Sequence, residues 1–160
     1  FMSLHADALE ADDARGASVY TLSDTGVEKS VERMAARHER GDMLAGVDLR
    51  GQGDGVAAAL MDLARAQTGP QGDRFAQAVV AALRASGARL NSRPRRVGQF
   101  AVLNAPDFAS VLIEAGFLSN ETDRAVLVTQ AGRARLVAGI AQAVQLWAQD
   151  EAARATGLLK

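Results

Sequence analysis

Short apolar runs of four to six residues, each bounded by turn-forming positions, predict four buried strands along the chain. The second run is rich in β-branched and aromatic side chains, which favour an extended backbone. The last two runs are separated by Asn104-Ala105-Pro106-Asp107 and are too short to form stable helices. The predicted strands comprise residues 1–4, 17–22, 100–103 and 110–113.

Between and after these strands, apolar side chains recur every three or four residues, as on one face of a helix. Gly69-Pro70 is expected to separate the second helix from the third, because proline inside a helix removes a backbone donor. Ser119 and Asn120 are candidate caps for the fourth helix. The buried stripe of the last helix is predicted to comprise Leu136, Ile140, Val144 and Trp147. The predicted helices comprise residues 27–40, 56–67, 73–86, 122–128 and 130–153.

The connecting segments complete the predicted fold. Residues 41–54 are punctuated by glycine, and residues 91–96 form a predicted loop that carries three arginines. Strands that alternate with helices indicate an α/β layered domain with a largely parallel sheet flanked by helices. A length of 160 residues suits one such domain.

Composition excludes several classes of protein. The 18 basic and 19 acidic side chains leave a formal net charge of −1, which argues against a nucleic-acid binder that relies on bulk charge. Apolar runs such as residues 78–83 are far shorter than a bilayer-crossing helix, so no membrane span is expected. The absence of cysteine excludes disulfides, thiolate metal sites and cysteine nucleophiles.

Two titratable side chains follow predicted strands, where functional residues of α/β sheets collect. His5 follows the first strand and Glu114 follows the fourth. A neutral imidazole suits zinc, and a carboxylate that faces an activated water can act as a general base. The sequence pattern leaves two other roles open: a structural hydrogen bond for His5, and a helix cap or ion pair for Glu114.

These two residues lie within motifs that resemble those of a known family. Residues 1–8, Phe-Met-Ser-Leu-His-Ala-Asp-Ala, resemble the Phe-x-Ser-x-His-Ala-Asp-Ala signature of zinc-dependent N-acetylmuramoyl-L-alanine amidases. Residues 111–120 resemble the strand and Glu-x-Gly-Phe-x-Ser-Asn turn of the same family, with Ala115 where threonine is often found. Residues 16–22, 39–49 and 100–103 resemble further family segments, in the same order. The resemblance extends from Phe1 to about Trp147.

The resemblance implies a phosphorylase/hydrolase-like α/β fold and hydrolysis of the amide bond between N-acetylmuramic acid and L-alanine in peptidoglycan. It implies zinc as the cofactor, His5 as a metal ligand and Glu114 as the catalytic carboxylate. The family's other two zinc ligands precede the segment that matches residue 1, and His38 falls in no ligand motif. Residues 1–160 are therefore expected to be the larger, C-terminal part of one catalytic domain, inactive alone. Such enzymes remodel the cell wall during daughter-cell separation, which places them in the periplasm or outside the cell.

The resemblance also implies a regulatory role for residues 27–54. Family members with a helical insertion there are held inactive until an activator of the LytM type displaces it. Glu39 matches the family glutamate of that segment and is the candidate regulatory residue. The competing interpretation is a solvated carboxylate at a helix end.

Two other functions stay open at this stage. The first is a non-catalytic peptidoglycan-binding module of the cell envelope that keeps the fold without the metal. The second is an intracellular α/β domain that resembles the amidases by chance. Arg93, Arg95 and Arg96 could contact acidic groups of the peptide stem or an anionic wall polymer, but solvated side chains are the favoured interpretation.

Overall fold

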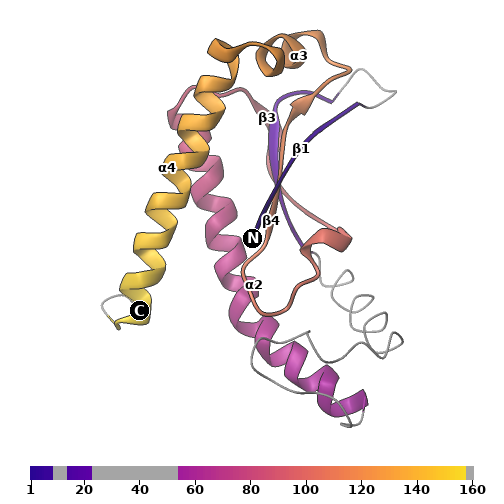
Figure 1. Ribbon diagram of the computed structural model, residues 1–160, viewed down its shortest axis with the longest axis vertical. Coiled ribbons are helices and arrows are strands. Elements are labelled where there is room, and N and C mark those ends of the chain that lie inside the picture. The colour runs from indigo at the N-terminus through magenta and orange to yellow at the C-terminus, as the bar shows by residue number, and fades with distance from the viewer. Residues whose placement is uncertain (9–13, 23–53, 158–160) are drawn as a thin grey trace.

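The computed structural model describes residues 1–8, 14–22 and 54–157, and Figure 1 shows their arrangement. Four strands form one sheet in the order β1-β4-β2-β3. The strands are β1 (Met2–Asp7), β2 (Ala17–Leu22), β3 (Leu90–Gly98) and β4 (Val111–Phe117). β1 pairs parallel with β4, β2 pairs parallel with β3, and β2 pairs antiparallel with β4. The sheet is therefore mixed: two of its three pairings are parallel, which fits the predicted largely parallel sheet, and the central pairing is antiparallel.

Two long helices cover one face of this sheet. α2 (Asp54–Ala85) packs against β2, β3 and β4, and α4 (Gln130–Ala155) packs against α2. α3 (Glu121–Val128) connects β4 to α4, as Figure 1 shows. Val79 and Leu83 of α2 are buried against Val19, Val111 and Ile113 of the sheet. The layered α/β fold expected from the sequence is confirmed, and its core lies between the sheet and α2. The predicted burial of the first strand is wrong, because the large apolar side chains of residues 1–4 are exposed.

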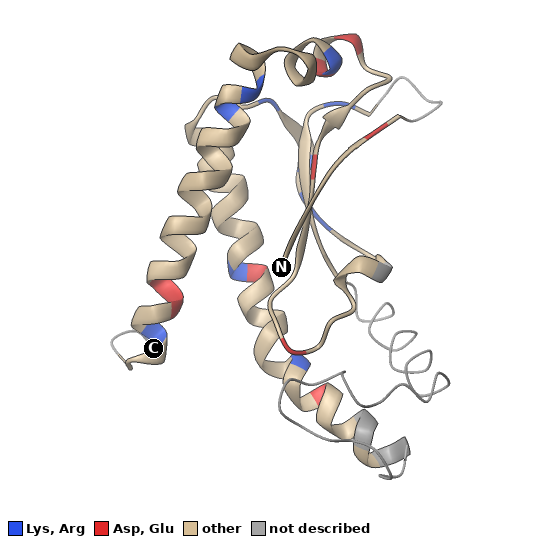
Figure 2. Ribbon diagram, in the orientation of Figure 1, with Lys and Arg blue, Asp and Glu red and all other residues tan. Residues whose placement is uncertain are grey.

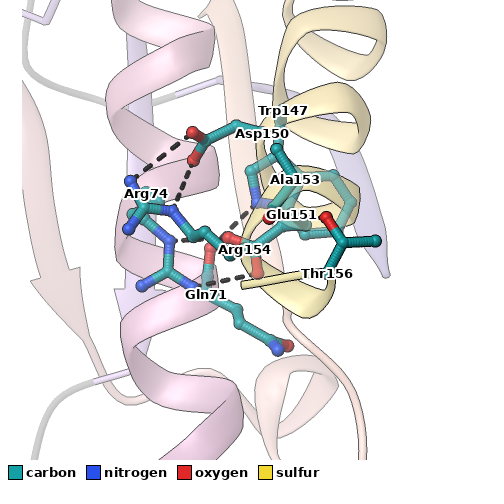
Figure 3. A network of polar contacts seen from close by, with 8 residues as sticks. All are labelled: Gln71, Arg74, Trp147, Asp150, Glu151, Ala153, Arg154 and Thr156. Atoms are coloured by element: carbon teal, nitrogen blue, oxygen red, sulfur yellow. Dashed lines mark hydrogen bonds and ion pairs between the residues drawn. The ribbon is translucent and has the colours of Figure 1, made fainter. Parts of the chain in front are cut away.

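The two long helices are joined by polar contacts as well as by packing (Figure 3). The Trp147 and Phe75 rings lie 4.7 Å apart, and Trp147 Nε1 donates to the Gln71 carbonyl at 3.2 Å. Arg74 donates to both carboxylate oxygens of Glu151, at 2.6 and 2.9 Å. This hydrogen-bonded pair raises the pKa of the Arg74 guanidinium, so the pair stays ionised. A fixed α2–α4 pair gives the sheet a rigid support.

The predicted break at Gly69-Pro70 is wrong, because α2 continues through both residues. Tertiary contacts hold the chain helical on each side of Pro70. Thr68 Oγ1 donates to the Pro106 carbonyl at 2.9 Å, and Gln71 receives the Trp147 hydrogen bond. These contacts offset the backbone hydrogen bond that proline cannot make.

The predicted basic loop at residues 91–96 is also wrong, because these residues belong to β3. β3 ends the described part of the sheet, and an edge strand tolerates both Pro94 and charged side chains. The register with β2 slips between Ala17 and Val19, which pair with Leu90 and Arg95. The additional β3 residues bulge between these two pairs.

The predicted strand at residues 100–103 is instead a short 3-10 helix, η2 (Ala101–Leu103). The Leu103 N–H donates to the Phe100 carbonyl at 3.0 Å, which closes the turn. Leu103 is buried at 2% exposure but Val102 is 42% exposed, so the predicted burial holds for Leu103 and not for the whole run. An apolar run of four residues can be buried in either conformation.

The last two helices confirm their predictions with one exception. Leu136, Ile140 and Trp147 pack on the core, but Val144 is 38% exposed and Ala143 is fully buried in its place. Among the described helices, none combines the length and apolar character that a membrane span requires. The predicted helix at 27–40 and the proposed insertion at 27–54, apart from the first residue of α2, lie outside the described residues.

Candidate active site

Glu114 lies between two neighbouring strands, on the sheet face away from α2. In the parallel pair its cross-strand partner is His5 of β1, and in the antiparallel pair it is Ser18 of β2. Ile113, the residue before it, belongs to the core against α2, so strand alternation sends the two side chains to opposite faces. The site thus lies on the sheet surface, within β4, and not beyond the strand end as predicted.

A cavity of about 700 Å³ opens over this surface. His5, Asp7 and Glu114 line one part of it, and residues of β2 and β3, including Tyr20 and Arg96, line another. The two candidate residues of the sequence analysis, 109 positions apart, are thus brought together in one cavity.

The Glu114 carboxylate is buried and oriented. It is 4% exposed, and its Oε1 accepts a hydrogen bond from the Asp7 backbone N–H at 2.9 Å. Burial raises the pKa of the Glu114 carboxyl above its ordinary value, and the negative charge of Asp7 adds to this shift. The Asp7 hydrogen bond and the nearby His5 oppose it. A carboxylate with a raised pKa exchanges protons more readily near neutral pH, as a general base and acid must.

His5 is exposed, and its Nε2 lies 2.9 Å from the Ser3 hydroxyl oxygen. Ser3 and His5 are two residues apart on β1, so their side chains project from the same face. The short distance to Ser3 fixes one orientation of the imidazole within the cavity wall.

Asp123 holds together the turn that follows Glu114, although no sequence motif pointed to it. Its carboxylate is 4% exposed and its Oδ2 accepts from the backbone N–H groups of Phe117, at 3.1 Å, and Gly16, at 2.7 Å. Its Oδ1 lies 3.8 Å from an Arg89 nitrogen. Gly116 has a φ of 151° and lies directly against this carboxylate, so a side chain there would be strained. The buried Asp123 carboxylate therefore contacts the residues directly before β2 and β3 and the last residue of β4.

The available sequence signal for Asp123 was its spacing from Asn120. The Asn120 side chain accepts from the Asp123 N–H at 3.2 Å, which confirms Asn120 as the cap of α3. The cap places Asp123 in the first helical turn, facing back toward the strand. The hydrogen bond that Asp123 accepts from Gly16 joins residues 107 positions apart in the chain, so no local sequence pattern predicts it.

Ser18 leaves a buried polar atom beside Glu114. Its side chain is 1% exposed, and its Oγ has no hydrogen-bond partner among the described residues. Ser18 is the antiparallel partner of Glu114, so its hydroxyl lies on the sheet face that carries the candidate base. A buried hydroxyl without a hydrogen-bond partner destabilises the folded state unless a further group forms a hydrogen bond with it.

The described residues fit a zinc site only in part. They contain no cluster of three or more His, Asp or Glu side chains that could hold a metal ion. His5 supplies one imidazole nitrogen in the cavity, with the Glu114 carboxylate on the adjacent strand. Glu39, the candidate regulatory residue, and His38 lie outside the described residues.

Arg95 and Arg96 of β3 have different surroundings. Arg95 lies 3.5 Å from the Asp73 carboxylate of α2, on the helix-covered face. Arg96 pairs with Tyr20 across the strands and lines the cavity. Figure 2 shows acidic and basic residues interspersed along the described elements. The expectation that all three arginines are only solvated is therefore too simple.

Comparison with known proteins identifies relatives along almost the whole chain. A profile of the N-acetylmuramoyl-L-alanine amidase family matches residues 1–146. The amidase AmiC of Neisseria meningitidis serogroup B is 34% identical over 149 residues, covering 91% of this chain and 35% of that protein. The amidase AmiA of Escherichia coli K12 is 30% identical over 145 residues, covering 90% of this chain and 50% of that protein. The chain thus spans half or less of the length of these relatives.

Solved structures of amidases share the fold. The CwlD amidase of Clostridioides difficile, in complex with the GerS lipoprotein, superposes with a TM-score of 0.60 at 17% identity, covering 93% of this chain and 54% of that one. The amidase AmiC2 of Nostoc punctiforme superposes with a TM-score of 0.56, covering 93% of this chain and 57% of that one. The profile match, the sequence relatives and the layered α/β fold agree with the motifs around His5 and Glu114, and the chain belongs to the N-acetylmuramoyl-L-alanine amidase family.

Proposed function

We propose that this chain supplies the catalytic carboxylate of an enzyme that hydrolyses the amide bond between N-acetylmuramic acid and L-alanine in peptidoglycan. One observation carries the proposal: Glu114 is buried in a cavity wall as the cross-strand partner of His5. Membership of the amidase family supplies the substrate and the reaction.

In the proposed reaction Glu114 moves one proton. The Asp7 N–H occupies Oε1 and fixes the carboxylate in the cavity wall, which leaves the second oxygen to accept a proton from the attacking water. The water oxygen bonds to the scissile carbonyl carbon, the carbon–nitrogen bond breaks, and Glu114 passes the proton to the departing amine of L-alanine. The raised pKa of Glu114 suits this carboxylate both to accept the proton from water and to donate it to the departing amine.

We propose zinc as the cofactor, with the His5 imidazole as one of its ligands. When bound, zinc would supply Lewis-acid polarisation of the scissile carbonyl and acidify the attacking water. The remaining ligands would come from outside the described residues, since these hold no three-ligand cluster. Because the family's other two zinc ligands precede the segment that matches residue 1, isolated residues 1–160 are expected to be inactive.

The biological setting proposed from the family is the periplasm or the cell exterior, with a role in cell-wall remodelling and daughter-cell separation. A LytM-type activator that displaces the segment around Glu39 is the proposed regulator. Deletion of residues 30–53 from the full-length enzyme should raise its basal activity if this segment is inhibitory. Unchanged basal activity would exclude autoinhibition by this segment.

The central test is Glu114→Gln in the full-length protein. Loss of general acid–base catalysis should lower the rate of peptidoglycan hydrolysis by about 10² to 10⁴-fold while zinc content is unchanged. Asp107→Asn, which neutralises an exposed loop carboxylate, is the matched control and should retain activity. Retained hydrolysis by the Glu114 variant would refute the assignment.

A non-catalytic peptidoglycan-binding module is the second candidate, because the described residues supply only one imidazole to the cavity. Zinc content of the full-length protein separates the two functions. One tightly bound zinc per chain, together with hydrolysis, supports the enzyme. Binding to purified peptidoglycan without metal or hydrolysis supports the module.

A further inference from the structure

Arg96 lies in the same cavity as Glu114 but on the far side of β2. It lines the cavity together with Tyr20, its cross-strand partner, and with Asn91 of the β3 bulge. Glu114 is the cross-strand partner of Ser18, two residues before Tyr20 on β2. Two strand spacings and two residues of rise separate the Arg96 and Glu114 Cα atoms by roughly 12 Å. This separation fits two neighbouring groups of one peptide substrate.

The Arg96 guanidinium is held in place before any ligand arrives. Its Nη2 donates to Asn91 Oδ1 at 2.8 Å, and its Nε donates to the Arg93 carbonyl at 3.1 Å. Asn91 is itself anchored, because its Nδ2 donates to the Arg15 carbonyl at 2.9 Å and its Oδ1 also accepts from the Arg93 N–H at 3.0 Å. An exposed arginine fixed in this way loses less conformational entropy when it binds a ligand.

Both anchoring acceptors are neutral oxygens, so the positive charge of Arg96 stays uncompensated. Among the described residues no carboxylate lies within ion-pair distance of Arg96. The neighbouring Arg95, in contrast, is paired with Asp73 on the opposite face of the sheet. Nη1 and the second hydrogen of Nη2 remain to donate, and this pair of donors matches the two oxygens of a carboxylate.

We propose that Arg96 is a specificity-determining residue that binds a free carboxylate on the second residue of the substrate's stem peptide. The inference rests on the proposed amidase function, which places the scissile bond beside Glu114. In the stem peptide L-alanine follows the scissile amide, and the next residue is a γ-linked D-glutamate whose α-carboxylate is free or amidated. The anchored guanidinium distinguishes these two forms, because an amide offers one neutral acceptor where the carboxylate offers two charged oxygens.

The test measures the affinity of two muramoyl-L-alanyl-γ-D-glutamyl peptides that differ only at this α-carboxylate, free in one and amidated in the other. Their C-termini are amidated, so that no other carboxylate differs. The affinities are measured by calorimetry on the full-length, metal-loaded protein. This protein carries Glu114→Gln, so that the peptides are not hydrolysed during the measurement. The free carboxylate should bind at least about 10-fold more tightly than the amide, as charge-assisted hydrogen bonds do.

In the same background Arg96→Gln should abolish this preference by weakening the acidic peptide alone, and Arg96→Lys should restore only part of it. Arg95→Gln removes an equal charge from the neighbouring position on the other face and should leave the preference unchanged. Equal affinities for the two peptides before substitution, or a preference that survives Arg96→Gln, would overturn the proposal.

Hydrolysis by the protein with Glu114 intact separates this inference from the proposed function. Cleavage of both peptides with equal kcat/KM would leave the amidase function standing and remove the role of Arg96. Selective binding of the acidic peptide without cleavage of either would support the role of Arg96 in binding and refute the hydrolytic function.

Discussion

His5 and Glu114 are direct cross-strand partners in the parallel pair of β1 and β4, although 109 residues separate them in the chain. Parallel pairing places both side chains on one face of the sheet, in the wall of one cavity. The consequence is that an imidazole and a buried carboxylate share a site that neither strand could form alone. Because the site exists only where β1 pairs with β4, substitutions in it report on both the stability of the sheet and the chemistry of the site.

The buried Glu114 carboxylate should destabilise the folded chain at neutral pH. Its pKa is raised by burial, so the folded state holds the proton to a higher pH than the unfolded state does. Below the ordinary glutamate pKa both states are protonated and no penalty exists. As pH rises through the ordinary and then the raised pKa, the free energy of unfolding falls, and the penalty is complete above the raised value.

Glu114→Gln removes this penalty and keeps an acceptor for the Asp7 N–H. Urea unfolding in the presence of a chelator should show the variant more stable than the wild type at pH 7 and equally stable near pH 4. Asp107→Asn is the matched control and should not reproduce this pH-dependent gain, because its carboxylate is exposed. A stability difference that does not vary with pH would contradict burial as the cause.

Asp123→Ala should cost about 3 kcal/mol or more in the free energy of unfolding. The substitution leaves two buried N–H groups, of Gly16 and Phe117, without their acceptor and removes the partner of Arg89. Asp150→Ala removes a half-exposed partner of Arg154 within α4 and should cost about 0.5 kcal/mol or less. Urea titrations of the two variants give the comparison, and equal losses would show that Asp123 does not join the three strand ends.

Two glycines predict different effects of the same substitution. Gly16 has a φ of 76°, and an added Cβ would lie 2.5 Å from the Leu90 carbonyl carbon, so Gly16→Ala should destabilise by about 2 kcal/mol or more. Gly69 lies inside α2, and apart from its chain neighbours nothing lies within 4 Å of an added Cβ. The helical gain of alanine there is opposed by the ring of Pro70, so Gly69→Ala should change the free energy of unfolding by about 1 kcal/mol or less. Thermal or urea unfolding measures both, and equal losses at the two positions would contradict the close approach of Gly16 to Leu90.

Elements that carry their own period were predictable from the sequence, and those that depend on distant contacts were not. β2 was predicted from its own β-branched and aromatic residues, and the apolar stripe of α4 marks most of the buried face of that helix. The helix across Pro70 depends on Pro106 and Trp147, and the β3 strand depends on pairing with β2. Both contradict local propensity because tertiary packing outweighs it.

The candidate site divides in the same way. His5 and Glu114 were found because each lies in a short motif, and the fold was needed only to bring them together. Asp123 and Arg96 carry no distinctive local pattern, and each acquires its surroundings from other segments of the chain. Arg96 differs from Arg95 by one position, yet strand alternation places Arg96 in the cavity and Arg95 beside α2.

Isolated residues 1–160 should bind zinc weakly and show no turnover. The family's other two zinc ligands precede the segment that matches residue 1, and among the described residues the cavity supplies one imidazole and no three-ligand cluster. Competition with a chromophoric chelator should give an affinity at least about 100-fold below that of the full-length protein, since loss of even outer-shell support can cost this much. In the full-length protein His5→Ala should lower zinc affinity, whereas Ser92→Ala, on the opposite wall of the cavity, should not. Amidase activity from the isolated residues would contradict an incomplete metal site, because it would require a full ligand set within these residues.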